Sequence, residues 1–160
     1  MDLLDREQRD FLCSGVSISL AACGDDRDNC VVRAVGCKLV DDGRRIAVFL
    51  RRSRSPDFFR FIQSTRRVAN VFCLPSTNRT IQIKGDDARV EDFVASDVAL
   101  IEAHLALFLQ QVVPLGVPES VVRTIFAHDP DDLVTLTYTP RALFSQTPGP
   151  KAGELLGRST

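Results

Sequence analysis

The sequence is poor in several residue types that commonly carry chemistry. Of its 160 residues two are histidines, one is a tyrosine and none is a tryptophan. His104 lies in an apolar helical segment and His128 in the turn HDPDD, with no nucleophile or metal ligand beside either, so both are interpreted as structural. The motifs GxSxG, HExxH and GxxxxGK[ST] do not occur. Hydrolytic catalysis therefore has little support, and no metal site is predicted.

The five cysteines contain no CxxC pair, which argues against a zinc site. They are scattered through apolar segments as an odd-numbered set: Cys13, Cys23, Cys30, Cys37 and Cys73. We interpret them as reduced thiols that pack as small apolar residues.

Charge of neither sign is in excess, since 20 Lys and Arg face 21 Asp and Glu for a formal net charge of -1. A dedicated nucleic-acid-binding domain would be strongly basic, so no nucleic-acid partner is expected. No apolar run reaches the roughly 20 residues that span a bilayer. The acidic start MDLLDREQRD is unlike a secretory signal. We therefore expect a cytoplasmic protein without a membrane partner.

Alternating and β-branched apolar residues predict six strands, over 16–23, 30–40, 46–50, 68–74, 80–93 and 133–140. Asp42-Gly43 indicates a hairpin between the second and third, and Gly85 a bend within the fifth. Helices are predicted over 3–12, 55–67, 96–113 and 121–126. Because short turns join the early strands, the predicted fold is mainly β, a small antiparallel barrel with flanking helices.

Basic residues crowd one part of this predicted barrel: Arg33, Lys38, Arg44, Arg45, Arg51, Arg52 and Arg54. Ser55 is the expected N-cap of the following helix, whose first turn adds unpaired backbone N–H groups. Guanidinium groups bind phosphate bidentately, so this grouping could hold a phosphoryl group. The alternative is a solvated surface that balances the acidic turns.

The order of these segments resembles the flavin-binding core of the pyridoxamine 5'-phosphate oxidase-like family, the FMN-binding split β-barrels. Arg33 and Lys38 have the family's spacing, with four residues between them. The strand end 48–51, Ser55 before a helix and the run 66–68 follow in the family's order. The strand that contains Gln82 looks like the one whose polar residue reaches the flavin.

The resemblance implies a six-stranded antiparallel split β-barrel over residues 1–145 and a homodimer with FMN bound at the subunit interface. It also implies a set of cofactor-binding residues: Arg33, Gly36, Cys37, Lys38, Phe49, Leu50, Arg51, Ser55, Gln82 and Lys84. Neither a catalytic residue nor the small-molecule substrate follows from it. The function it implies is that of a flavoprotein oxidoreductase of unknown substrate.

Two departures from the family pattern keep alternatives open. Asp57 stands where a phosphate-binding lysine is usual, and no Arg-x-His motif follows His128, so oxidation of pyridoxamine phosphate itself is not expected. One alternative is a split-barrel dimer that has lost flavin and acts as a non-catalytic binding or stress-related module. Another, a deazaflavin or haem binder, would need a different loop or a haem-ligating histidine.

The run FSQTPGPKAGELL at 144–156 has the proline, glycine and lysine content of a phosphate loop but neither its glycine spacing nor its Lys-Ser/Thr pair. We predict that residues 146–160 form an extended C-terminal arm, laid across the barrel or its dimer partner. Gln146 and Lys151 would then reach a site built elsewhere.

Overall fold

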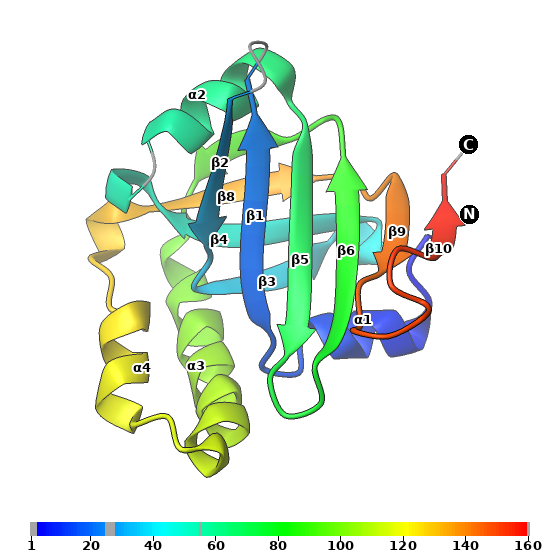
Figure 1. The fold of residues 1–160 in the computed structure, drawn as a ribbon. Coiled ribbons are helices and arrows are strands. Elements are labelled where there is room, and N and C mark those ends of the chain that lie inside the picture. The colour runs from blue at the N-terminus through cyan, green and yellow to red at the C-terminus, as the bar shows by residue number, and fades with distance from the viewer. Residues whose placement is uncertain (1–2, 25–27, 55, 160) are drawn as a thin grey trace.

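A computed structural model describes residues 3–24, 28–54 and 56–159 (Figure 1). Within them, ten strands form two antiparallel sheets. The larger sheet, in the order β10-β9-β6-β5-β1-β2, comprises β1 (Ser17–Cys23), β2 (Asn29–Arg33), β5 (Val68–Leu74), β6 (Arg79–Gly85), β9 (Ala142–Ser145) and β10 (Leu155–Arg158). The smaller sheet, in the order β3-β4-β8-β7, comprises β3 (Gly36–Val40), β4 (Arg45–Arg51), β7 (Arg89–Asp92) and β8 (Leu133–Tyr138).

Four helices flank the sheets: α1 (Arg6–Leu12), α2 (Pro56–Thr65), α3 (Val98–Val112) and α4 (Glu119–Phe126). Short 3-10 turns lie at η1 (Asp41–Gly43), η2 (Arg52–Arg54), η3 (Ala95–Asp97), η4 (Val113–Leu115) and η5 (Pro130–Asp132). The predicted fold class, an antiparallel split barrel with flanking helices, is confirmed. The described strands exceed the six that were predicted, because two predicted strands each divide in two and the C-terminal segment adds β9 and β10.

The main core lies between the two sheets, as the alternation along each strand requires. Ile46, Val48 and Leu50 of β4 point into it with exposed fractions of 1% or less. Ile18 and Phe72 of the larger sheet meet them from the other side. The odd-numbered residues of β4 therefore face outward, away from this core.

The predicted strand 30–40 is two strands in different sheets, so the expectation that Arg33 and Lys38 share a strand is wrong. The backbone N–H of Ala34 donates to Ile18 O in the larger sheet (3.0 Å), and that of Val35 donates to Phe49 O in the smaller one (3.0 Å). The chain changes sheets between these two bonds. This change separates Arg33 from Lys38 although only four residues lie between them.

The predicted strand 80–93 divides in the same way, into β6 and β7. A Cβ atom at Gly85 would lie 2.6 Å from Cδ2 of Tyr138 in the core. Only glycine therefore lets the backbone pass this close to the tyrosine ring. The bend predicted at Gly85 is the point where the chain leaves the larger sheet.

Helices α3 and α4 lie side by side and cover part of the outer face of the smaller sheet (Figure 1). Their buried residues form a second apolar cluster that includes Phe49 and Leu133 of the sheet together with Ile101, Phe108, Val122 and Phe126. The α3 helix begins after Asp97, slightly later than the predicted start of the segment 96–113. By length and apolar composition alone, Ala95–Leu115 is sufficient to cross a membrane, and 22% of its most apolar window is buried.

The turns and the second helix follow the sequence closely. The β3–β4 hairpin turns through three residues with positive φ, Asp41 (52°), Asp42 (58°) and Gly43 (85°), residue types that adopt this conformation most readily. The helix predicted over 55–67 is α2, whose apolar residues Phe58, Phe61 and Ile62 are buried. Ser55, the predicted N-cap, lies outside the described residues.

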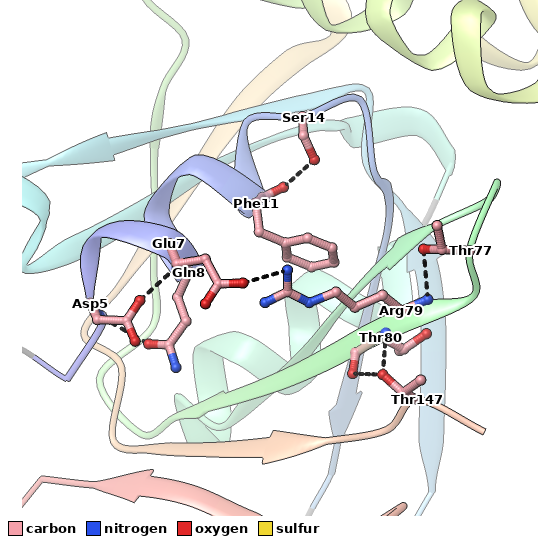
Figure 2. A network of polar contacts seen from close by, with 9 residues as sticks. All are labelled: Asp5, Glu7, Gln8, Phe11, Ser14, Thr77, Arg79, Thr80 and Thr147. Carbon is pink, nitrogen blue, oxygen red and sulfur yellow. Dashed lines mark hydrogen bonds and ion pairs between the residues drawn. The ribbon is translucent and has the colours of Figure 1, made fainter. Parts of the chain in front are cut away.

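The N-terminal helix is fastened to β6 through Arg79 (Figure 2). The Arg79 guanidinium pairs with the Glu7 carboxylate at 2.9 Å and lies 4.5 Å from the centre of the Phe11 ring. A capping box between Asp5 and Gln8 begins the helix. Arg79 therefore has a structural role, which distinguishes it from the arginines described next.

Candidate functional site

A hollow of ≈ 430 Å³ lies where β2, η2, α2 and α4 meet. We call it the β2–α4 pocket. It is lined by Val31, Val32, Arg33, Leu50, Arg51, Arg54, Phe59, Thr124 and Ile125. Three of these residues are arginines, and among the described residues that line the pocket none is acidic. The pocket is therefore a cationic depression with partly apolar walls.

Arg33 ends β2 at the edge of the larger sheet. Its position is set by the pairing of β2 with β1, in which Arg33 lies opposite Ser19. Arg33 Nη1 donates to Ser17 Oγ at 3.0 Å. This bond fixes one end of an exposed guanidinium and leaves its other N–H groups directed at solvent or at a ligand.

Arg51 ends β4 and is half-buried, whereas Arg33 is exposed. The Nη1 atom of Arg51 donates to the carbonyl oxygen of Ala127, just after α4, at 2.9 Å. Its Nε atom is buried and has no hydrogen-bond partner among the described residues. Burial lowers the pKa of Arg51, and the nearby charges of Arg54 and Arg33 lower it further, against an opposing effect of Asp132. An anion at this position would favour the charged guanidinium.

Arg54 is presented by the η2 turn, which Asp132 holds in place. The carboxylate of Asp132 accepts the backbone N–H of Ser53 at 2.7 Å and the Ser53 hydroxyl at 2.6 Å. Charge-assisted bonds of this length are among the stronger ones in proteins. Asp132 therefore orients the loop that carries Arg54.

Asp57, which departs from the family pattern, is not among the described residues that line the β2–α4 pocket. Its carboxylate pairs with Arg60 one turn along α2 at 3.0 Å, and both side chains are about two thirds exposed. The neighbouring arginine thus offsets its charge.

The walls of the β2–α4 pocket are apolar. Leu50 forms part of the floor with 1% exposed, and Phe59 comes from α2. At the rim, Val31 is 66% exposed and Ile125 is 40% exposed, high values for side chains of this size. The arrangement can hold an anion against the arginines and an apolar or planar group against the walls.

Of the residues that the resemblance implies, the structure brings Arg33, Leu50 and Arg51 together in this pocket. Lys38 lies on the outer face of the smaller sheet instead. Its ammonium pairs with the Asp97 carboxylate at 2.6 Å, and that carboxylate side chain is 9% exposed. A separate hollow of ≈ 210 Å³ lies there.

Gly36 and Phe49 lie under α3. A Cβ atom at Gly36 would meet Phe49 Cδ2 at 3.3 Å and the backbone of Ile101 at 3.6 Å. The Phe49 ring is fully buried and packs edge-on against Phe93 at 5.4 Å between centroids. These two residues face a helix, and a cofactor could reach them only if α3 moved.

Cys37 points toward the core, where its thiol donates to Leu12 O at 3.5 Å. Burial raises the pKa of Cys37 strongly, and the neighbouring Cys13 adds to the effect. The thiol is therefore protonated at neutral pH and a poor nucleophile. All five cysteines are free, as expected, but Cys13 and Cys23 are exposed and not packed as apolar residues.

Gln82 and Lys84 lie on β6, which β5 and β1 separate from β2 in the sheet. Lys84 Nζ lies 4.9 Å from the centre of the Phe144 ring, on the neighbouring β9. Gln146 Nε2 donates to Gln82 Oε1 at 3.5 Å, so Gln146 contacts this strand. Within one chain the structure does not bring Gln82 and Lys84 to the β2–α4 pocket. Ser55 lies outside the described residues.

Sequence reasoning missed the contribution of α4 to the β2–α4 pocket. Thr124 and Ile125 line it although some 90 residues separate them from Arg33. No local motif indicates this contact, because it depends on how α3 and α4 pack on the smaller sheet. Arg54 belongs to the basic group that the sequence shows, but only the structure reveals that Arg54 lines the pocket and Arg52 does not.

No protein-family model and no curated protein matches this sequence. Its fold, however, is similar to solved structures over nearly its whole length. HupZ of Group A Streptococcus is 12% identical with a TM-score of 0.55, and the match covers 94% of this chain and 99% of that one. A Lactobacillus delbrueckii protein described as a putative pyridoxamine 5'-phosphate oxidase is also 12% identical, with a TM-score of 0.54, and the match covers 90% of this chain and 95% of that one.

A third match is HutZ, the haem storage protein of Vibrio cholerae, at 12% identity and a TM-score of 0.51, with 91% and 95% covered. Together with the two sheets described above, these similarities define the class of fold as a split β-barrel. The chain has the fold of the pyridoxamine 5'-phosphate oxidase-like proteins, as the order of its sequence segments indicated. At this level of identity the similarity concerns the fold alone.

Proposed function

We propose that the β2–α4 pocket binds the phosphate end of FMN and that the protein is a cytoplasmic FMN-dependent oxidoreductase acting on an unidentified small molecule. The observation that carries the proposal is the convergence of Arg33, Arg51 and Arg54 on one hollow whose described lining residues include no acid. Relatives with this fold include a protein described as a pyridoxamine 5'-phosphate oxidase. The resemblance in sequence order points to the same cofactor.

A phosphate fits the pocket for electrostatic reasons. Three guanidinium groups in one depression repel one another, and a dianion between them removes that repulsion. A phosphate oxygen would also accept a charge-assisted bond from the Arg51 guanidinium, which lines the pocket and donates through Nη1 to Ala127 O. Arg33 and Arg54 would contribute charge-assisted bonds from the opposite sides.

The apolar walls suit the remainder of the flavin. When bound, FMN supplies the electron and hydride transfer, and the chain supplies binding and orientation. Leu50 and Phe59 would exclude water beside the arginines. No side chain of the described residues is assigned a catalytic role.

We further propose that the protein is a homodimer in which the partner closes the mouth of the β2–α4 pocket. Val31 at the rim and Val121 and Ile125 on α4 are all 40% or more exposed. Apolar side chains gathered at the edge of a pocket are typical of a surface that a partner covers. Gln82 and Lys84 of the partner could then reach a flavin that they do not reach within one chain.

Haem is the second candidate ligand, because one structural neighbour is described as a haem storage protein. The chain has two histidines, and His104 is only 6% exposed, so His128 is the candidate that could ligate iron. The Nδ1 atom of His128 lies 2.9 Å from Phe126 O, which leaves Nε2 for another contact. If the protein binds haem through His128, adding haem to the wild type should shift the Soret band, and adding it to the His128→Ala variant should not.

The experiment that tests the flavin proposal is a titration of the purified protein with FMN, followed by quenching of flavin fluorescence. Arg51→Gln should weaken binding by about tenfold or more, because a bond to a charged group contributes about 1.5–3 kcal/mol. Arg67→Gln is the matched control, since Arg67 is exposed and does not line the pocket. Saturable binding in the wild type that both variants retain equally would overturn the assignment of the pocket.

A further inference from the structure

A second hollow, of ≈ 570 Å³, lies between α2 and β7, and we call it the α2–β7 pocket. Its lining residues are Arg52, Pro56, Phe59, Arg60, Ile62, Gln63, Arg66, Ala88, Arg89 and Val90. Phe59 also lines the β2–α4 pocket, whereas none of Arg33, Arg51 and Arg54 lines this one. The two hollows therefore have separate sets of charged residues.

Four arginines from different parts of the chain meet in the α2–β7 pocket. Arg52 comes from η2, Arg60 from α2, and Arg89 from β7, while Arg66 follows α2. Among the described residues that line the pocket none is acidic. Within the described part of the chain, the only ion pair of these four arginines joins Arg60 to Asp57, which lies outside the lining. The fold thus concentrates positive charge on a concave surface without a carboxylate inside it.

The backbone holds two of these arginines at fixed positions. Arg66 has a positive φ of 55°, a conformation that costs a residue with a side chain about 1 kcal/mol or more. Its carbonyl oxygen accepts the backbone N–H of Ala88 at 3.0 Å. This bond ties the end of α2 to the residue that precedes Arg89. The fold therefore keeps Arg66 close to the Arg89 strand despite the repulsion between their charges.

The floor of the α2–β7 pocket is apolar. Ile62 and Ala88 are each 2% exposed, Phe59 supplies an aromatic ring, and Val90 is 37% exposed. Gln63 adds an amide that can donate and accept hydrogen bonds. The volume lies within the range of small-molecule sites, roughly 300–1,000 Å³. Such a surface fits a ligand that has both an anionic group and an apolar or planar body.

We propose that the α2–β7 pocket is a second binding site, for an organic phosphate that differs from the cofactor. The arginines hold the phosphate groups, with Arg66 and Arg89 as the central pair, and the ring or apolar body of the ligand lies against Phe59 and Val90. This goes beyond the proposed flavin site, because it assigns a separate ligand to a separate group of charges.

The test is NMR titration of the ¹⁵N-labelled protein with pyrophosphate and then with ADP, at fixed ionic strength. Pyrophosphate reports on the anion subsite alone, and ADP adds a planar body. We expect saturable shifts of amide signals in 60–66 and 88–90, and tighter binding of ADP than of pyrophosphate. The double variant R66Q/R89Q should weaken both by about tenfold or more. R67Q is the control, since Arg67 adjoins Arg66 in sequence but does not line the pocket.

Three results would overturn the proposal: no saturable shift up to millimolar pyrophosphate, shifts confined to the β2–α4 pocket, or equal weakening by R67Q. Tighter binding of pyrophosphate than of ADP would refute the role given to the apolar floor. The R66Q/R89Q variant should still bind FMN as the wild type does. If R51Q loses FMN binding and keeps ADP binding, the two pockets bind their ligands independently, and each proposal can be refuted without the other.

Discussion

Replacing Lys38 by methionine should destabilise the protein and leave its affinity for FMN unchanged. The family resemblance implies that Lys38 binds the cofactor phosphate, but its ammonium lies 2.6 Å from Asp97 on the outer face of the smaller sheet. Asp97 is 7% exposed and is the N-cap residue of α3, without a side-chain capping bond. The variant would leave this carboxylate buried and unpaired.

The size of the effect follows from the burial of the two partners. Removing one partner of a fully buried ion pair costs about 3–5 kcal/mol. The Lys38 side chain is 31% exposed, so water partly replaces it, and the positive end of the α3 dipole compensates further. We therefore expect a loss of about 2 kcal/mol in the free energy of unfolding, or a fall in Tm of roughly 4–8 °C.

Urea denaturation of Lys38→Met, Asp97→Asn and the double variant measures this coupling directly. The double variant should be less destabilised than the sum of the two single variants. Each single variant leaves one charge without its partner, whereas the double variant removes both charges. FMN titration of Lys38→Met should give an affinity within about twofold of the wild type. Unchanged stability together with lost FMN binding would refute the reasoning and restore Lys38 to the cofactor site.

Two further predictions concern the α3 helix. Burial lowers the pKa of His104, so the unfolded chain takes up a proton first as the pH falls below about 6.5, and the stability should decrease with it. In His104→Leu this part of the pH dependence, measured by urea denaturation between pH 5 and 7, should disappear; an unchanged slope would contradict the assignment. Gly15→Ala should cost about 2 kcal/mol more than Gly116→Ala, because both have positive φ but only a Cβ at Gly15 would approach the Leu107 backbone, at 2.6 Å. Equal Tm values for these two variants would show that α3 does not pack against Gly15.

Local pattern was enough to predict most of the elements. The apolar periodicity of 55–67 gave the buried residues of α2, and Asp42-Gly43 gave the β3–β4 turn. It also indicated the bend at Gly85, but it was not enough to predict that the chain changes sheets within 30–40. Most residues of 30–40 suit a strand. The division falls where the backbone N–H of Ala34 donates to Ile18 in the larger sheet and that of Val35 donates to Phe49 in the smaller one.

The site was only partly predictable for the same reason. Arg33 and Arg51 were selected from the order of segments, and the structure places both in the β2–α4 pocket. Gly36 and Phe49 have equally suitable positions along the chain, yet α3 covers them. The helix pair that decides this lies more than 45 residues further on, so no local pattern could have indicated it.

The central claim is that the arginines of the β2–α4 pocket hold the phosphate of a flavin. Calorimetric titration of the wild type and of Arg51→Gln with FMN and with riboflavin, which lacks the phosphate, tests it most directly. We predict that the wild type binds FMN at least tenfold more tightly than riboflavin and that Arg51→Gln removes most of this difference without weakening riboflavin. Equal affinity of the wild type for the two flavins, or an unchanged preference for FMN in Arg51→Gln, would contradict the claim.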